Sequence, residues 1–268
     1  MEALQRLLDI MGQLRDPVKG CPWDLRQTYS TIVPYTLEEA YEVADSIQRG
    51  EMAELRDELG DLLFQIVFYS QIAKEEGHFD FNDVASGICD KMIRRHPHVF
   101  SDAQYQNEAE LRHAWEQQKA EERTQRKESS DPASHMDGVA HALPALIRAE
   151  KLQKRAARVG FDWPDANGAL EKVREEFDEV QAEIGKADQD RLEDELGDLL
   201  FSMVNVIRLL GLDAEQSLSR ANGKFERRFR VMESMLSAEG ISNMQDLSLE
   251  RLDAAWERVK RNKSGAKA

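Results

Sequence analysis

Residues 175–179 read Glu-Glu-Phe-Asp-Glu, and residues 195–198 read Glu-Leu-Gly-Asp. Each segment places two carboxylates three positions apart, and such positions lie on one face of a helix. Between them, residues 185–191 are polar and begin with a glycine, which is typical of a turn. The pattern therefore predicts two antiparallel helices that direct four carboxylates toward one point. These are Glu176, Glu179, Glu195 and Asp198.

Such a group of carboxylates differs in energy from an ordinary acidic surface. One exposed like-charge pair on a helix costs only roughly 0.2–0.5 kcal/mol. Four carboxylates about 5 Å apart repel at about 3 kcal/mol per pair, with an effective dielectric of ~20. A convergent group therefore needs a cation, and oxygen ligands without His or Cys favour Mg²⁺ over zinc. The alternative is a solvated acidic face, because the chain has 51 acidic residues among 268.

The same acidic pattern occurs earlier in the chain, at a constant offset of 137 positions (Glu38 to Glu175, Asp61 to Asp198). Both copies continue into Leu-Leu-Phe, at 62–64 and 199–201. This repetition favours the metal-site interpretation over the solvated face. It also indicates an internal duplication rather than a solenoid, because two copies are too few for one.

The fold class that follows is all-α, with two tandem helical-bundle domains. Hydrophobic residues make up 41% of the chain, enough for packed cores, and the seven prolines are few enough for long helices. The domains are predicted at residues 1–120 and 141–268. Residues 121–140 are rich in Arg, Lys, Glu and Ser, and are predicted to form a linker.

Apolar residues with a 3.6-residue period predict the individual helices. The first ends before Asp16, and Thr36 followed by Glu39 matches a capping box that would start the second. Further helices are predicted at 52–76, 81–95, 111–122, 143–159, 171–184 and 191–210. His96 and His98 flank Pro97, and helix termination is favoured there over metal binding.

Composition also limits the partners. A net charge of −15 argues against nucleic acid or an anionic membrane surface as the main partner. No apolar run approaches the ~18 residues of a membrane span, and the N-terminus lacks the features of a signal peptide. Two cysteines, Cys21 and Cys89, do not suggest a disulfide framework. We therefore expect a soluble cytoplasmic protein.

Basic and aromatic residues after the acidic helices suit a nucleotide. Lys224 and Arg228 are four positions apart, so they share a helix face and could bind phosphate. Trp256 could stack on a base. A bound metal could neutralise phosphate oxygens and activate a water for attack on phosphorus. The alternatives are that the basic pair complements the helix dipole and that the tryptophan is a core residue.

Five sequence segments, spread over both copies, are specific enough to suggest a family. They are 20–24 (Gly-Cys-Pro-Trp-Asp), 35–39 (Tyr-Thr-Leu-Glu-Glu), 58–64 (Glu-Leu-Gly-Asp-Leu-Leu-Phe), 94–100 (Arg-Arg-His-Pro-His-Val-Phe) and 224–229 (Lys-Phe-Glu-Arg-Arg-Phe). With them the chain resembles the MazG-type nucleoside triphosphate pyrophosphohydrolases of the all-α NTP pyrophosphatase group. The resemblance implies Mg²⁺-dependent hydrolysis of NTPs and dNTPs to a nucleoside monophosphate and pyrophosphate. It also implies a homodimer and a house-cleaning role in the nucleotide pool.

The resemblance further implies roles for individual residues. The metal ligands would be Glu176, Glu179, Glu195 and Asp198. Glu175 would be an auxiliary acid that orients water, so Glu175, Glu176 and Glu195 form the expected catalytic set. The expected substrate contacts are Lys172, Lys224, Arg228, Trp256 and Lys260.

The two copies differ at two positions that matter for activity. The counterpart of Lys172 is Tyr35, and the counterpart of Asn205 is Phe68. Asn205 continues the stripe of Glu195 and Asp198 along its helix, so it joins the expected substrate-binding residues. We predict that the C-terminal copy carries most of the activity. The N-terminal copy would be a weaker site or a structural, dimer-forming half.

Two other functions remain as alternatives. A di-iron carboxylate bundle would need Glu-x-x-His, and no His lies three residues after any of these acids. A non-catalytic helical adaptor could use the acidic cleft to bind a basic partner. The adaptor would not need Lys172, Lys224 or Trp256 beside the acids.

Overall fold

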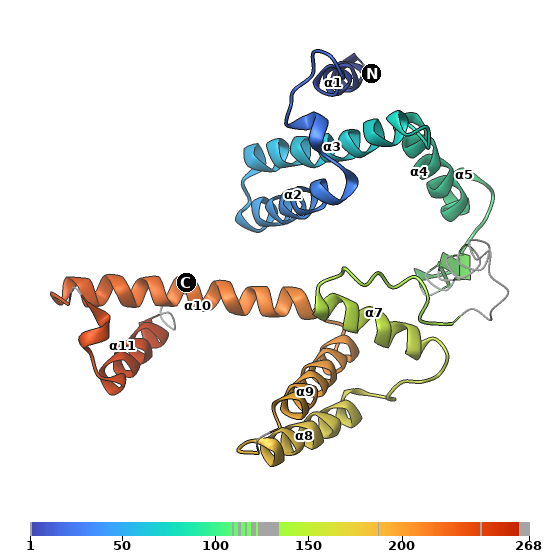
Figure 1. The fold of residues 1–268 in the computed structure, drawn as a ribbon. Coiled ribbons are helices and arrows are strands. Elements are labelled where there is room, and N and C mark those ends of the chain that lie inside the picture. The colour runs from blue at the N-terminus through green and yellow to red at the C-terminus, as the bar shows by residue number, and fades with distance from the viewer. Residues whose placement is uncertain are drawn as a thin grey trace. The chain divides into compact units, whose positions relative to one another are not determined.

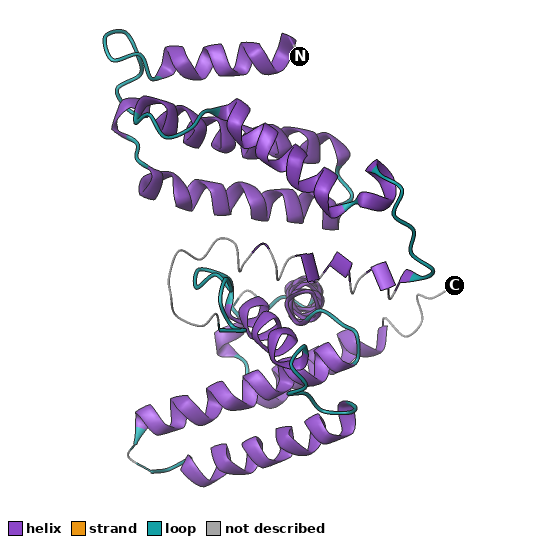
Figure 2. Ribbon diagram, turned by 90° about the vertical axis from the view of Figure 1, so that its right-hand side faces the viewer, coloured by secondary structure: helices purple, strands orange, loops and turns teal. Residues whose placement is uncertain are grey.

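The computed structural model describes residues 2–108, 134–186, 188–241 and 243–262, with a few positions between 110 and 122. The described residues form helices and loops without a strand, which confirms the all-α prediction (Figure 2). The chain divides into two compact units, residues 1–121 and 122–268. The predicted linker at 121–140 and the predicted helix at 111–122 fall largely outside the described residues.

The first unit is built around a helical hairpin. Its helices are α1 (Glu2–Leu14), α2 (Tyr29–Arg49), α3 (Met52–Glu75), α4 (Phe81–Arg95) and the short α5 (Pro97–Phe100) (Figure 1). Gly50 ends α2 in the left-handed conformation (φ 76°), and its N–H bonds to the carbonyls of Ile47 and Ser46. This cap turns the chain sharply, so α3 runs back along α2.

The start of α2 differs from the prediction. Thr28 is its N-cap and forms a capping box with Thr31: each residue's backbone N–H donates to the other's hydroxyl, at 3.4 and 2.8 Å. Thr36 lies inside the helix, and its hydroxyl donates to the carbonyl of Ile32 (3.1 Å). The predicted start at Thr36 was wrong, because Thr28 caps the helix instead and α2 already begins at Tyr29. Pro34 lies in the second turn, where its missing N–H removes a single helix hydrogen bond.

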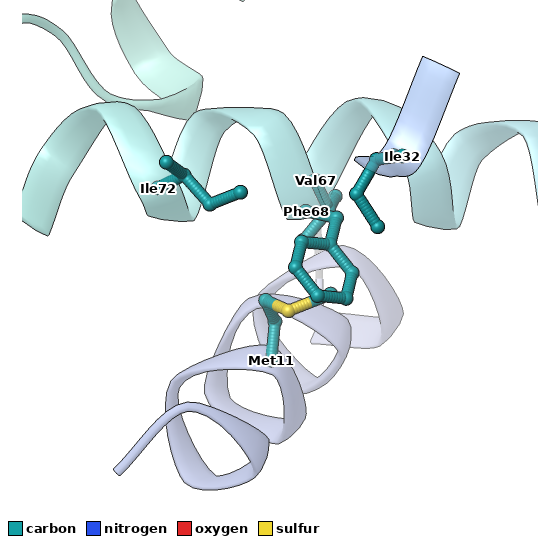
Figure 3. Close-up of a cluster of buried hydrophobic side chains, with 5 residues drawn as sticks. All are labelled: Met11, Ile32, Val67, Phe68 and Ile72. Atoms are coloured by element: carbon teal, nitrogen blue, oxygen red, sulfur yellow. The ribbon is translucent and has the colours of Figure 1, made fainter. Parts of the chain in front are cut away.

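A solid apolar core joins α1, α2 and α3. Figure 3 shows its members, whose side chains meet between the three helices. They are Met11, Ile32, Val67, Phe68 and Ile72. Burying a side chain of this size contributes about 1.5–3 kcal/mol. This core therefore fixes α1 against the hairpin.

The arginine Arg15 completes the contact between α1 and α3. Its Nε and Nη2 donate to the carboxylate of Glu75 (2.9 and 2.6 Å), and its Nη1 donates to the carbonyl of Asp24 (2.6 Å). The guanidinium carbon also lies 5.4 Å from the centre of the Phe68 ring. Polar contacts thus add to the apolar core in holding the end of α1 against α3.

The second unit repeats the hairpin and adds a second pair of helices. Its helices are α7 (Ala145–Ala157), α8 (Ala166–Glu183), α9 (Gln189–Leu209), α10 (Ala214–Ala238) and α11 (Leu249–Asn262). In Figure 1, α8 and α9 lie side by side like α2 and α3. The duplication expected from the sequence is therefore present as two tandem helical hairpins. None of the described helices is long and apolar enough to cross a membrane.

A separate apolar cluster holds α10 to α11. It contains Met232, Leu236, Ala255 and Val259. Partly buried side chains that include Phe229 and Trp256 pack around it. α10 and α11 thus have a core of their own, distinct from the α8–α9 contact.

Candidate functional site

The α8–α9 hairpin brings three of the four predicted ligands together. One carboxylate oxygen from each of Glu176, Glu179 and Glu195 lies within 4.8 Å of the other two. Glu176 is only 5% exposed, Glu195 is half-buried and Glu179 is exposed. At such separations mutual repulsion of ionised groups is strong. The group therefore has the donor chemistry and spacing of a hard-cation site.

Asp198 lies outside this group of three. It follows Glu195 by one turn of α9, and it is exposed. Its role as a ligand remains a prediction.

Lys172 reaches into the carboxylate group from one turn earlier on α8. Its Nζ lies 2.9 Å from Glu175 Oε1 and 2.7 Å from Glu176 Oε1. The hydrogen bonds to Glu175 and Glu176 raise the pKa of Lys172, so it stays protonated. A positive charge thus lies directly beside the most buried carboxylate of the group.

The neighbouring carboxylates also change the pKa of Glu179. Its pKa is raised above the usual 4.5, first by its hydrogen bond with Glu176 and then by burial and by the charges of Glu176 and Glu195. A raised carboxyl pKa means that the ionised form is disfavoured at this position. A bound divalent cation would reverse this effect, because it favours the ionised form.

An ion-pair network at the end of the hairpin was not predicted from the sequence. Glu183 is 3% exposed, and its Oε1 lies 2.9 Å from Lys186 Nζ and 3.2 Å from Arg191 Nε. The same Arg191 Nε lies 3.9 Å from Glu195 Oε1. Glu183 and Arg191 each lie four positions from a predicted ligand, so helical spacing could have identified them.

Four of the predicted substrate contacts lie on α10 and α11 instead. Lys224 is exposed, Arg228 is half-buried, and Lys260 forms an ion pair with Glu257. The Trp256 ring lies 5.2 Å from the Phe225 ring. In the part of the chain that is described, no hydrogen bond, ion pair or ring contact links these four residues to the carboxylates.

Asn205 belongs to α9 but lies away from the carboxylates. Its Oδ1 accepts hydrogen bonds from Arg208 Nε (3.1 Å) and Nη2 (2.6 Å). Arg208 also donates to the carboxylate of Asp162 from Nη1 (3.1 Å). Asn205 and Arg208 line a cavity of about 480 Å³.

The first unit keeps the acids without the lysine. Carboxylate oxygens of Glu39, Glu58 and Asp61 lie within 4.8 Å of one another. Burial, followed by the neighbouring acidic charges, raises the pKa of Glu39 and of Glu58. Tyr35, in place of the lysine, packs edge-on against Trp23 at 5.8 Å.

The two histidines beside Pro97 contribute to packing. The His96 ring lies 5.3 Å from the Trp115 ring, and the His98 ring lies 5.5 Å from the Tyr105 ring. His96 Nδ1 lies 2.8 Å from the carbonyl of Met92, in the preceding turn. Over the described residues, neither histidine joins a group that could hold a metal.

Comparison with known proteins gives one family match and two similar relatives. The sequence model described as "MazG nucleotide pyrophosphohydrolase domain" matches residues 27–100 and 166–231. These segments contain both hairpins and both carboxylate groups. A protein of Escherichia coli K12 named "Nucleoside triphosphate pyrophosphohydrolase" is 53% identical over 263 residues, which cover 97% of this chain and 98% of the relative. A protein of Thermotoga maritima named "Nucleoside triphosphate pyrophosphohydrolase/pyrophosphatase MazG" is 40% identical over 256 residues, which cover 96% of this chain and 95% of the relative.

Proposed function

The chain belongs to the MazG nucleotide pyrophosphohydrolase family, and on that basis we propose that it is a nucleoside triphosphate pyrophosphohydrolase. The proposed reaction cleaves NTPs and dNTPs between the α- and β-phosphates and releases a nucleoside monophosphate and pyrophosphate. The observation that carries this proposal is the group of Glu176, Glu179 and Glu195 beside Lys172. It places cation-binding oxygens next to a protonated amine, which is the combination that a triphosphate and its metal require.

The metal proposed for this site is Mg²⁺. The fit rests on three carboxylates, no softer ligand in the group, and a Glu179 whose pKa is raised by its acidic neighbours. We propose Asp198, the next acid along α9, as the fourth ligand. When bound, Mg²⁺ neutralises phosphate oxygens and lowers the pKa of a coordinated water.

The remaining steps fall to side chains of the α8–α9 hairpin. Lys172 would leave Glu176 for a phosphate oxygen, because the metal would take its place beside that carboxylate. Glu175 is exposed and lies within reach of the same amine. It would orient the attacking water and accept its proton, alongside Glu176 and Glu195 as the catalytic set.

The α10 and α11 residues form the second part of the proposal. Lys224, Arg228 and Lys260 would hold the remaining phosphate charge. The Nε of Arg228 is buried without a hydrogen-bond partner among the described residues, so an anion would supply one. Trp256 packs against Phe225. It would therefore help to hold these cations in position, and only the exposed part of its ring would contact the substrate.

We also propose a homodimer that acts in the cytoplasm as a nucleotide-pool house-cleaning enzyme. Both hairpins expose large apolar side chains, among them Leu59 in the first unit and Phe177, Leu196 and Leu200 in the second. Exposed apolar surface of this kind supports an interface between subunits. The N-terminal unit, which has Tyr35 in place of Lys172, would be mainly structural.

The two rival functions agree less well with the site. A di-iron centre of this type uses histidine, and the carboxylate group contains three glutamates alone. An acidic surface for a basic partner does not need Lys172, which occupies the Glu176 carboxylate.

The test is product analysis. The full-length chain is incubated with ATP and Mg²⁺, and the products are identified by phosphorus NMR. We expect pyrophosphate and AMP, and turnover at least 100-fold slower in Glu195→Gln. Release of orthophosphate, or of nothing, would exclude the proposed reaction.

A further inference from the structure

A further glutamate, Glu183, lies one turn beyond the carboxylate group on α8. Glu179 and Glu183 follow Glu176 by three and seven positions, so all three share one face of the helix. Glu183 is nevertheless not a member of the group whose oxygens lie within 4.8 Å of one another. It is 3% exposed, even less than Glu176. A carboxylate buried to this degree needs positively charged partners.

Two cations beyond the end of α8 neutralise Glu183. Its Oε1 lies 2.9 Å from the Nζ of Lys186 and 3.2 Å from the Nε of Arg191. Gly185 makes the turn in the left-handed conformation (φ 88°). Asp188 then caps α9, because its side chain accepts a hydrogen bond from the backbone N–H of Arg191 (3.1 Å). The turn and the cap therefore bring both cations back to the buried acid.

Arg191 is shared between this buried acid and the candidate metal ligand Glu195. Its Nε lies 3.9 Å from Glu195 Oε1, compared with 3.2 Å from Glu183 Oε1. The guanidinium stays charged, and the Arg191 side chain is 62% exposed, so it has room to move. In the absence of Glu183, the attraction of Glu195 for this cation would be unopposed. Arg191 would then move onto Glu195.

An arginine paired with Glu195 would compete with a metal ion. A guanidinium commonly forms two parallel hydrogen bonds with a carboxylate, and these engage both oxygens. Glu195 contributes an oxygen to the carboxylate group, so a metal would have to displace the guanidinium before it could bind there. The affinity of the site for a cation thus depends on which acid holds Arg191.

The first unit lacks both members of the Glu183–Arg191 pair. At the 137-residue offset, Ser46 corresponds to Glu183 and Glu54 corresponds to Arg191. Ser46 is fully buried and carries no charge. Over the described residues, no ion pair reaches the acidic group of this unit. The acid and the arginine are therefore present together in one unit and absent together from the other, as expected if the acid is needed only where the arginine is present.

We propose that Glu183 is a positioning residue that holds Arg191 away from Glu195 and so keeps this ligand free for the metal. The inference rests on the proposed function, because it takes Glu195 as a ligand. Glu183 contacts neither metal nor substrate in this role and acts through Arg191. Loss of Glu183 should weaken metal binding by releasing the arginine, and removal of the arginine should restore it. A residue that only stabilises the end of the hairpin would show no such recovery.

The test measures metal binding without a substrate, so hydrolysis is not involved. Mn²⁺ is the probe, because it prefers the same oxygen ligands as Mg²⁺ and its unbound fraction is measured by EPR. The full-length reference protein carries Glu58→Gln, which removes one acid from the group in the first unit. Adding Glu183→Gln to this reference should raise the Kd for Mn²⁺ about 10- to 100-fold, the usual effect of changing a partner of a metal ligand.

Two double variants separate positioning from net charge. Glu183→Gln/Arg191→Gln should bind Mn²⁺ about as tightly as the reference, because the competing cation is gone. Glu183→Gln/Lys186→Gln has the same net charge but leaves Arg191 free to reach Glu195. It should bind as weakly as Glu183→Gln alone. Equal recovery in the two double variants, or recovery in neither, would overturn the proposal.

Arg191→Gln alone covers the case in which loss of Glu183 unfolds the hairpin. Circular dichroism shows whether each variant keeps its helices. Arg191→Gln should bind Mn²⁺ at least as tightly as the reference, because it removes the competing cation. Weaker binding would show that Arg191 supports Glu195 instead of competing for it, and this would overturn the role assigned to Glu183.

Failure of this inference is distinguishable from failure of the proposed function. If the wild type releases pyrophosphate but Glu183→Gln binds Mn²⁺ normally, Glu183 has no positioning role and the enzyme assignment stands. If the recovery pattern appears but no triphosphate is hydrolysed, the role of Glu183 stands and the reaction does not. If the reference protein does not bind Mn²⁺, the inference fails whatever the products of hydrolysis.

Discussion

The Nζ of Lys172 lies 2.7 Å from Oε1 of Glu176, one turn away on α8. Glu176 has a side chain that is 6% exposed, so this amine neutralises the most deeply placed acid of the candidate site. In the first unit, Tyr35 stands at the equivalent position and contacts Trp23 instead. The two halves therefore share acids but differ in the cation beside them.

Replacing Lys172 should lower the activity, because the substrate loses a contact to one of its phosphates. In Lys172→Met, we expect kcat/KM for ATP to fall about 10- to 100-fold, because a charge-assisted hydrogen bond contributes about 1.5–3 kcal/mol. Steady-state kinetics measures the change. Arg174→Met is a matched control, since it removes a cation of α8 that pairs with Glu171 and not with the carboxylate group. Equal losses in both variants would contradict a specific phosphate contact.

The second prediction compares the equivalent acids Glu195 and Glu58. Glu195→Gln should lower kcat at least 100-fold, because even partners one step removed from a metal ligand typically change activity 10- to 100-fold. Glu58→Gln, 137 positions earlier, should leave more than half of the activity. Both are measured by pyrophosphate release under identical Mg²⁺. If Glu58→Gln proved the more damaging change, the working site would belong to the first unit.

The third prediction concerns stability at the equivalent positions 68 and 205. Phe68→Asn should destabilise the first unit by about 3–5 kcal/mol, because it removes a fully buried ring from the core of Figure 3. Asn205→Phe should destabilise the second unit much less, because Asn205 lines a cavity that can accept the larger ring. Urea unfolding of each variant provides the comparison. Similar losses for both would show that the second unit has no room for the larger side chain.

The fourth prediction uses the raised pKa of Glu179 in the metal-free protein. A carboxyl whose pKa is higher folded than unfolded destabilises the fold above the folded pKa, and this effect vanishes below the unfolded value near 4.5. Glu179→Gln should therefore raise the melting temperature at pH 7 in EDTA, and the gain should disappear as the pH falls through 4.5.

Adding Mg²⁺ provides the control for this pH experiment. The cation should raise the melting temperature of the wild type more than that of Glu179→Gln, because the wild type keeps the full ligand set. If Glu179→Gln melted below the wild type in EDTA, ionisation of Glu179 would not destabilise the fold.

Sequence alone was sufficient for much of the fold, because apolar spacing and caps are local signals. The bounds of α4, Phe81–Arg95, were predicted correctly from its sequence, and those of α3 and α9 within a few residues. The start of α2 was missed because two threonines, Thr28 and Thr36, both offer a cap. Which of them caps the helix depends on the partner hydroxyl of Thr31.

The candidate site was likewise predictable from the sequence only in part. The carboxylate group was predictable because helical spacing places Glu176 and Glu179 on one face. The cavity was not, because Gln153 and Asn205 are 52 positions apart in the chain and belong to helices whose packing sets their distance. The burial of Phe68 was likewise hidden, since its position on the acidic stripe suggested an exposed face.

The contrast between the buried Phe68 and its cavity-lining counterpart Asn205 affects how the protein can change. A substitution at Phe68 alters the folding of a whole hairpin, whereas one at Asn205 alters mainly what fits inside. A substitution beside the cavity can therefore spare the buried core that holds the first hairpin together. Engineering of the second unit should begin at Asn205 and Gln153, which line its cavity, and leave the core residues Phe68 and Met11 untouched.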